Sequence, residues 1–204
     1  MEVKTIAVIG ADALGRGIAS IAAQSGYDTV LEDVSDERLA KAAAWITRNH
    51  ESFVAGGVLE ARGRGAATAR VSLAHTVEDA IRDADLIIET LPDEMEMQIE
   101  LFTILDKFAK PNAIFASTGF LSITELAEIT FCADRCIGMR FLESAEGTGI
   151  VALIKLVKGA ETTYETITRC ALVARRMGRE VVVVDETVPN RAGESERKFA
   201  NAQD

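Results

Sequence analysis

Two glycines near the start of the chain stand where a bound dinucleotide would need them. Gly10 directly follows the apolar run 5–9, and Gly15 opens a stretch with apolar residues at helical spacing. In a dinucleotide fold, glycines in this turn allow a tight bend, close approach of the backbone to a pyrophosphate, and packing of helix on strand. Gly10 and Gly15 meet the first and third needs, whereas Asp12 occupies the place of the middle glycine.

Asp12 is the unusual residue of this turn. With Ala13 and Leu14 it forms the predicted start of a helix, whose N-terminal end would face the phosphates. A carboxylate a few ångströms from a pyrophosphate costs about 1–4 kcal/mol at an effective dielectric of about 20. The cost shrinks if the side chain points outward, and the aspartate would then serve mainly as a helix N-cap. We expect Asp12 to weaken cofactor binding to an extent set by its orientation.

An acidic residue follows at the spacing that a nucleotide site needs. Asp33 ends a predicted strand about 20 residues after the glycine turn, where a carboxylate accepts hydrogen bonds from the adenine-ribose hydroxyls. The same carboxylate would repel a 2′-phosphate, so the pattern favours NAD over NADP. The competing interpretation is a tight turn that binds nothing, followed by an acid that only caps a strand.

The elements that position these residues alternate between strand and helix. Alternation with short links predicts an α/β fold of the Rossmann type, with a doubly wound, mostly parallel sheet and helices on both faces. A helical-pair excursion, broken at Gly56-Gly57, follows the second strand. Strands are expected at 5–9, 28–33, 71–73, 86–91, 113–116, 136–141, 152–157 and 181–184. Helices are expected at 14–25, 35–53, 59–69, 76–82, 94–108 and 161–177, and after Ser122, which with Glu125 has the form of a capping box.

Length and composition bound the class of protein. The 204 residues are 48% hydrophobic, enough for one sizeable core, and carry a formal net charge of -10. This charge argues against nucleic acid or an anionic membrane as a partner. The sequence has no signal-peptide pattern and no apolar run near the ~18 residues of a membrane span, so we expect a cytoplasmic protein. We divide it into a Rossmann-type NAD-binding domain over 1–189 and a polar, flexible tail over 190–204.

The cysteines and histidines do not form a metal-binding pattern. Cys132 and Cys136 lack companion ligands nearby, and Cys170 stands alone, so we expect buried or merely tolerated thiols and no metal. His75 is expected in a solvated loop. His50 is expected late in an exposed helix.

Segments spread along nearly the whole chain share one family pattern. They are 7–11, 15–19, 31–35, 56–59, 85–89, 100–102, 121–126 and 181–185. In these motifs the chain resembles the NAD-binding domain of 3-hydroxyacyl-CoA dehydrogenases. The resemblance implies NAD as cofactor, an acyl-CoA-like ligand near the helical excursion, and a role in fatty acid metabolism. It also implies that Leu91, Asp93 and Gln98 lie near the cofactor, with Gln98 in place of a family lysine.

The catalytic positions that the resemblance implies hold unsuitable residues. In the family a histidine removes the proton of the 3-hydroxyl while hydride passes to NAD, and a glutamate orients that histidine. Here Arg140 stands at the histidine, Lys155 at the glutamate, and Glu143 at an asparagine that positions the substrate. Arginine is no base at neutral pH, because its pKa exceeds about 12. Lys155 would act as a base only if burial lowered its pKa strongly, and Glu143 or Glu146 would otherwise pair with Arg140 as a structural ion bridge. No catalytic residue is therefore secure.

The family also continues into a helical domain that supplies dimer contacts and closes the site. The implied partners are thus a second copy of the chain or a separate helical subunit. Three functions follow from these observations. The chain is an NAD(H)-binding domain with impaired or lost dehydrogenase activity, or an active NAD-dependent 3-hydroxyacyl-CoA oxidoreductase completed by a partner subunit, or a ligand-free interaction or structural protein.

Overall fold

The computed structural model describes residues 2–55, 61–143 and 151–186. The predicted tail over 190–204 and the predicted helix start at Leu59 lie outside these ranges. Within the three ranges, no helix has the length and apolar character needed to cross a membrane.

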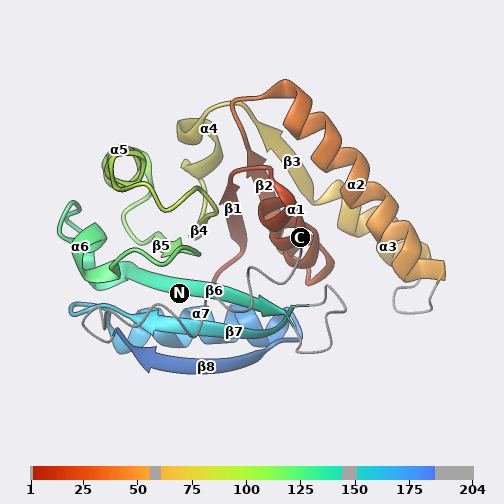
Figure 1. Ribbon diagram of the computed structural model, residues 1–204. Helices are drawn as coiled ribbons and strands as arrows, with labels where there is room; N and C mark the ends of the chain where they lie inside the picture. The colour runs from red at the N-terminus through yellow and green to blue at the C-terminus, as the bar shows by residue number, and fades with distance from the viewer. Residues whose placement is uncertain (1, 56–60, 144–150, 187–204) are drawn as a thin grey trace, which may run out of the picture.

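A single sheet runs through the described residues. Its strands are β1 (Thr5–Ile9), β2 (Asp28–Glu32), β3 (Val71–Ala74), β4 (Leu86–Glu89), β5 (Ile114–Ser117), β6 (Cys136–Glu143), β7 (Val151–Lys158) and β8 (Glu180–Asp185). They are ordered β3-β2-β1-β4-β5-β6-β7-β8 (Figure 1). All neighbours are parallel except β6 and β7. The chain winds outward in both directions from β1 and β4, so the predicted doubly wound sheet is confirmed.

Helices cover both faces of this sheet. They are α1 (Ala13–Gln24), α2 (Asp36–Ala55), α3 (Ala61–Ala69), α4 (Val77–Ile81), α5 (Met95–Phe108), α6 (Ile123–Ala127), the short 3-10 turn η1 (Ala133–Arg135) and α7 (Tyr164–Arg176). One apolar core joins α1, α2 and α7 to the sheet through residues such as Ile18, Leu39 and Val173. The other core joins α4, α5 and α6 to the opposite face, with Phe102 and Leu126 among its members.

Helix caps account for small differences from the predicted boundaries. The helix predicted from Glu161 begins at Tyr164, because the Thr163 side chain accepts a hydrogen bond from a first-turn amide. Ser122 caps α6 as predicted, since its hydroxyl oxygen accepts a hydrogen bond from the Glu125 amide at 3.2 Å. The capping residue, rather than the apolar spacing, thus sets where these helices begin.

The prediction for His50 was wrong. This histidine is fully buried rather than placed on an exposed helix. Its Nε2 lies 3.1 Å from Ser20 Oγ in α1, and its Nδ1 lies 3.0 Å from Thr68 Oγ1 in α3. The periodicity of α2 alone does not reveal that α1 and α3 both pack against it. Burial lowers the pKa of His50, so the neutral ring joins the three helices.

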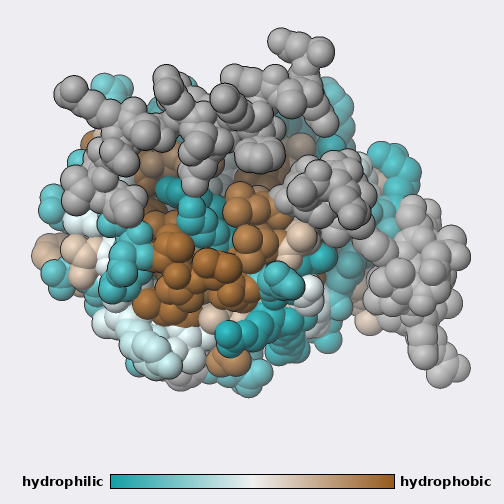
Figure 2. All heavy atoms as spheres, turned by 60° about the horizontal axis from the view of Figure 1, so that its bottom comes forward, coloured by the Kyte–Doolittle hydropathy of each residue, from teal (hydrophilic) through white to brown (hydrophobic). Residues whose placement is uncertain are grey.

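The sheet ends in a strand that is open to solvent. β8 pairs only with β7 among the described strands, while α7 packs over one face of this part of the sheet. Val182 and Val183 of β8 are 45% and 47% exposed. Figure 2 shows apolar side chains gathered on this side of the molecule, which lies at the bottom of Figure 1.

Candidate functional site

The glycine turn joins β1 to α1 in a geometry that only glycine fits. Gly10 has a φ of 100°, and a Cβ there would lie 2.6 Å from Thr90 Oγ1. A Cβ on Gly15 would lie 1.8 Å from the Gly10 carbonyl oxygen. The two glycines therefore serve the tight turn and the helix–strand contact, as the sequence predicts.

Asp12 caps the helix that follows this turn. Its Oδ1 accepts a hydrogen bond from the Gly15 amide at 2.8 Å, which confirms the capping interpretation. The first amides of a helix have no intrahelical partner. Those of Ala13 and Leu14 donate to no residue within the described ranges, and both residues are exposed. The start of α1 thus has two amides without an acceptor in the described residues, next to a carboxylate that is bonded to the Gly15 amide.

Asp33 lies directly beneath the glycine turn. Its Oδ2 accepts a hydrogen bond from the Ala11 amide at 3.1 Å, and its Oδ1 accepts one from the Ser35 amide at 2.8 Å. Arg38 of α2 holds the same carboxylate with Nε at 2.9 Å and Nη2 at 2.8 Å. Only 5% of Asp33 is exposed, so this carboxylate is fixed before any ligand arrives. Sequence reasoning missed Arg38, although a basic residue in the first turn after an acid-ended strand was a usable signal.

A second carboxyl group, also missed, adjoins Asp33. Glu32 ends β2 and is only 3% exposed. Burial, and then the neighbouring Asp33, raises its pKa to about 7, against the opposing effect of Arg38. Alternation along a strand sends Glu32 to the opposite face from Asp33. The end of β2 therefore presents one carboxylate and one group that titrates near neutrality.

Another buried acid organises the end of β4. Glu89 Oε2 accepts hydrogen bonds from the Leu91 amide at 2.8 Å and from Gln98 Nε2 at 3.1 Å. Glu89 and Gln98 are each 1% exposed. Burial raises the pKa of Glu89, and hydrogen bonds from Ser117, Gln98 and Leu91 oppose that rise. The structure thus brings Leu91 and Gln98 together through a residue that the sequence did not single out, and Gln98 points inward at Glu89.

Asp93 braces the turn that follows β5. Its Oδ1 accepts a hydrogen bond from the Phe120 amide at 2.8 Å. A Cβ on Gly119 would lie 2.1 Å from that oxygen, so only glycine lets the carboxylate reach under the turn. The Gly119 amide donates to Ser117 Oγ at 3.2 Å. Asp93 therefore holds the turn after β5, which lies between the predicted cofactor residues and Arg140.

Arg140 and Lys155 lie directly opposite one another on β6 and β7. Arg140 Nε donates to the Gly119 carbonyl oxygen at 3.2 Å, and the guanidinium carbon lies 4.6 Å from the centre of the Phe120 ring. Both cations line a pocket of about 300 Å³. The other residues that line it are Phe120, Leu121, Ser122, Glu125, Val157, Val184, Asp185 and Glu186. Glu143 is the last residue of β6, and its side chain lies outside the described part of the structure.

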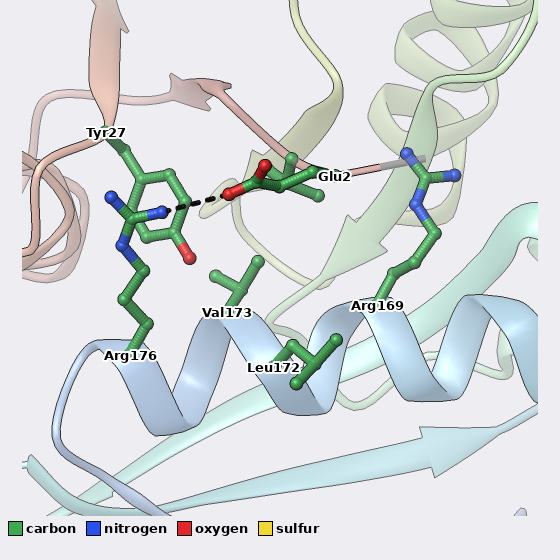
Figure 3. Close-up of a pocket in the computed structure, with 7 residues that line it drawn as sticks. Glu2, Tyr27, Arg169, Leu172, Val173 and Arg176 are labelled. Atoms are coloured by element: carbon green, nitrogen blue, oxygen red, sulfur yellow. Dashed lines mark ion pairs between the residues drawn. The ribbon is translucent and has the colours of Figure 1, made fainter.

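These groups meet at the carboxyl ends of the central parallel strands. The glycine turn follows β1, Asp33 follows β2, the Glu89 network ends β4, and the Gly119 turn follows β5. Ligands of doubly wound sheets bind at this edge, where the direction of winding reverses. A larger pocket of about 350 Å³ at the amino ends of β1 and β2 contains none of the predicted site residues (Figure 3).

The remaining histidine and the cysteines stay outside this site. His75 is exposed, as predicted, and its Nδ1 lies 2.9 Å from Asp36 Oδ1. The three cysteines are free and buried, and burial raises the pKa of Cys170 to about 12. Among the described residues, no group of three or more histidine, cysteine or acidic side chains is placed to hold a metal ion.

Comparison with known proteins identifies a consistent set of relatives. A family model described as "3-hydroxyacyl-CoA dehydrogenase, NAD binding domain" matches residues 5–187. A 3-hydroxybutyryl-CoA dehydrogenase of Bradyrhizobium diazoefficiens is 34% identical over 90% of this chain and 62% of its own length. A probable 3-hydroxybutyryl-CoA dehydrogenase of Bacillus subtilis is 32% identical over 91% of this chain and 64% of its own length. The chain therefore spans less than two thirds of these relatives.

Solved structures give the same result for the fold. The 3-hydroxybutyryl-CoA dehydrogenase of Escherichia coli superposes with a TM-score of 0.83 at 29% identity, covering 92% of this chain and 39% of that one. The (S)-3-hydroxybutyryl-CoA dehydrogenase of Ralstonia eutropha gives a TM-score of 0.83 at 27% identity, covering 94% of this chain and 68% of that one.

Proposed function

The chain belongs to the 3-hydroxyacyl-CoA dehydrogenase family through its NAD-binding domain, and we propose that it binds NAD(H) while its dehydrogenase activity is impaired or lost. One observation carries the second half of this proposal. Arg140 and Lys155 face each other at the positions where the family resemblance calls for a histidine and a glutamate.

The described residues fit the cofactor. Gly10 and Gly15 shape a turn without side chains, and the amides of Ala13 and Leu14 have no acceptor within the described ranges at the start of a helix of 12 residues, which favours an anion. Asp33 is fixed at the end of β2, where it would accept hydrogen bonds from ribose hydroxyls. Leu91 and Asp93 would border the nicotinamide half, whereas the buried Gln98 would support Leu91 from behind through Glu89. When bound, NAD supplies an acceptor for hydride.

We propose NAD rather than NADP. The Asp33 carboxylate is preorganised by Ala11, Ser35 and Arg38, and it would repel a 2′-phosphate at the position of the ribose hydroxyl. Arg38 reduces this repulsion, but it already forms a hydrogen bond through Nε and an ion pair through Nη2 with Asp33. A titration in which NADH binds at least tenfold more tightly than NADPH supports the assignment, and equal affinities would refute it.

The proton-transfer half of the family reaction has no suitable group at the expected place. Arg140 keeps its proton at neutral pH, and Lys155 directly opposite adds a second cation. The carboxyl groups that line the same pocket, Glu125, Asp185 and Glu186, do not stand at the two positions that the family resemblance assigns to proton transfer. Turnover of 3-hydroxybutyryl-CoA by the purified chain at ordinary enzymatic rates, about 1–1000 per second, would overturn this part of the proposal.

A second candidate is an oxidoreductase completed by a partner subunit. Val182 and Val183 of β8, which are 45% and 47% exposed, would supply an apolar surface for contact with such a partner. In that case a helical subunit, or a second copy of the chain, would close the site and supply the missing proton acceptor for an acyl-CoA substrate of fatty acid metabolism. The assay is NADH formation with and without a candidate subunit. Activity that appears only with the subunit favours this alternative.

We also propose that the protein resides in the cytoplasm. It is supported by the three free thiols, which suit a reducing compartment.

A further inference from the structure

We propose that Glu32 is a specificity-determining residue of the cofactor site, and that the charge of its side chain sets how strongly the protein rejects the 2′-phosphate of NADP(H). The inference rests on the proposed function, because it concerns the same cofactor site. It deepens that proposal by assigning part of the discrimination to a second acid, whose charge depends on pH.

Glu32 is in direct contact with the glycine turn. Its backbone carbonyl oxygen accepts a hydrogen bond from the Gly10 amide at 2.9 Å. The next residue, Asp33, accepts one from the Ala11 amide at 3.1 Å. Both residues therefore join the end of β2 to the turn over which a dinucleotide would lie. A change of charge at Glu32 thus occurs beside the expected position of the adenine ribose.

The side chain of Glu32 is buried and lacks the contacts that hold Asp33. Only 3% of Glu32 is exposed, and its Oε1 has no hydrogen-bond partner within the described residues. The Asp33 carboxylate, in contrast, accepts hydrogen bonds from Ala11, Ser35 and Arg38. A buried carboxylate that lacks such donors is costly to ionise. Burial, and then the charge of Asp33, accordingly raises the pKa of Glu32 to about 7.

The charges that act on Glu32 come from β2, α2 and α4. Arg38 of α2 lowers the pKa of Glu32, whereas Asp33 and Glu78 of α4 raise it. Below pH 7 Glu32 is neutral, and Arg38, which pairs with Asp33 at 2.8 Å, balances the charge of that carboxylate. Above pH 7 Glu32 is ionised, and Arg38 then faces two carboxylates. A 2′-phosphate at this place therefore meets stronger repulsion at high pH.

Two other groups could produce a pH dependence of the same kind. His75 follows Ala74, the register partner of Glu32 on β3, and its Nδ1 lies 2.9 Å from Asp36 Oδ1. A histidine that gains a proton in acid would also attract a phosphate. The phosphate itself gains charge near pH 6, because its second ionisation lies there. Variants of Glu32 are therefore needed to isolate its contribution.

The quantity to measure is the ratio of the NADPH to the NADH dissociation constant, obtained by fluorescence titration of the full chain at pH 6 and pH 8. We expect this ratio to rise from pH 6 to pH 8 at least threefold more in the native chain than in Glu32→Gln, which removes the charge and keeps the shape. Glu32→Leu, a second neutral variant, should behave like Glu32→Gln. Circular dichroism checks that each variant is folded.

Two control variants accompany this measurement. Glu37→Gln removes an exposed carboxylate from the first turn of α2, where it pairs with Lys41, and should keep the native rise. His75→Gln should also retain most of the rise.

An equal rise in the native chain and in a folded neutral variant of Glu32 would overturn the inference, and so would an equal loss of the rise in Glu37→Gln. NADH binding with a ratio that does not change with pH refutes this inference alone. The absence of NADH binding at both pH values refutes the proposed function as well.

Discussion

At the scale of single residues, Asp12 exerts two opposing effects on the same helix end. Its carboxylate caps α1 through the Gly15 amide at 2.8 Å, a contact that contributes about 0.5–2 kcal/mol of stability in comparable helices. The same negative charge lies at the start of α1, where a pyrophosphate would approach the amides of Ala13 and Leu14. Because Asp12 is exposed, solvent screens part of that repulsion. The stability of α1 therefore depends on the capping oxygen of Asp12, whereas the affinity for a pyrophosphate depends on its negative charge.

Asp12→Asn separates these properties, since an asparagine keeps the capping oxygen and removes the charge. We expect NADH affinity to rise about threefold to tenfold, that is by about 0.7–1.4 kcal/mol, with little change in melting temperature. Asp12→Gly should raise affinity similarly but lower stability slightly. The readout is NADH fluorescence together with thermal melting. Asp36→Asn, at the exposed start of α2, is the matched control, and an equal gain there would show a general charge effect.

The positions of Arg140 and Lys155 are also testable as a pair. Arg140→His combined with Lys155→Glu restores a base and an orienting acid on opposed strand positions. We expect NADH formation from 3-hydroxybutyryl-CoA to rise on the order of a hundredfold above the native chain, the lower range for general acid–base catalysis. Each single variant should show a much smaller rise in the rate of NADH formation. Native-level rates in the folded double variant would show that other departures from the family dominate.

At the scale of elements, the helical pair α2–α3 depends on one buried histidine. His50 contacts hydroxyls in α1 and α3, and its lowered pKa means that the folded state favours the neutral ring. Above pH 6.5, the reference value of its pKa, the ring is neutral in the folded and unfolded states alike. As the pH falls below that value, the unfolded state binds the proton first, so stability is lost.

We therefore expect the melting temperature to fall between pH 7.5 and pH 5.5 by more in the native chain than in His50→Gln. The variant itself should be about 0.5–1.5 kcal/mol less stable at pH 7.5, because the buried Ser20 hydroxyl and the half-buried Thr68 hydroxyl each lose one hydrogen bond. His75→Gln, at the exposed histidine, should keep the native pH profile. Glu32, whose pKa is raised to about 7, acts with the opposite sign, so each variant is compared with the native chain at equal pH. Identical profiles for all three proteins would contradict this role.

The helices and strands could largely be predicted from the sequence, whereas the contacts between their side chains could not. Alternating apolar runs and glycines located the strands and the doubly wound class, since both are local signals. The sequence did not reveal that His50 is buried, that Glu89 gathers Leu91 and Gln98, or that Arg38 holds Asp33. The His50 contacts join α2 to α1 and α3, so periodicity within α2 carries no information about them. The Arg38 and Gln98 contacts span 5 and 9 residues of the chain, but they depend on how the turn after each strand folds, which periodicity does not specify either.

At the scale of the whole molecule, we expect β8 to mediate association between copies of the chain. Among the described strands β8 pairs only with β7, so its other edge could accept a strand from another chain, and Val182 and Val183 are half exposed. Val183→Lys, at a position 47% exposed, should reduce concentration-dependent association in light scattering. NADH binding should not change, because Val183 lines neither the glycine turn nor the Arg140 pocket. Greater association in the variant would show that this edge does not mediate contacts.

The most direct test of the account is a single-turnover experiment. The native chain, in excess over 3-hydroxybutyryl-CoA and saturated with NAD⁺, is mixed rapidly while NADH absorbance is followed. Because an arginine and a lysine stand where the family resemblance calls for a histidine and a glutamate, we predict no NADH above the uncatalysed background, although the same sample binds NADH in a fluorescence titration. Stoichiometric NADH within seconds would contradict the account, since some group in the chain would then be accepting the hydroxyl proton.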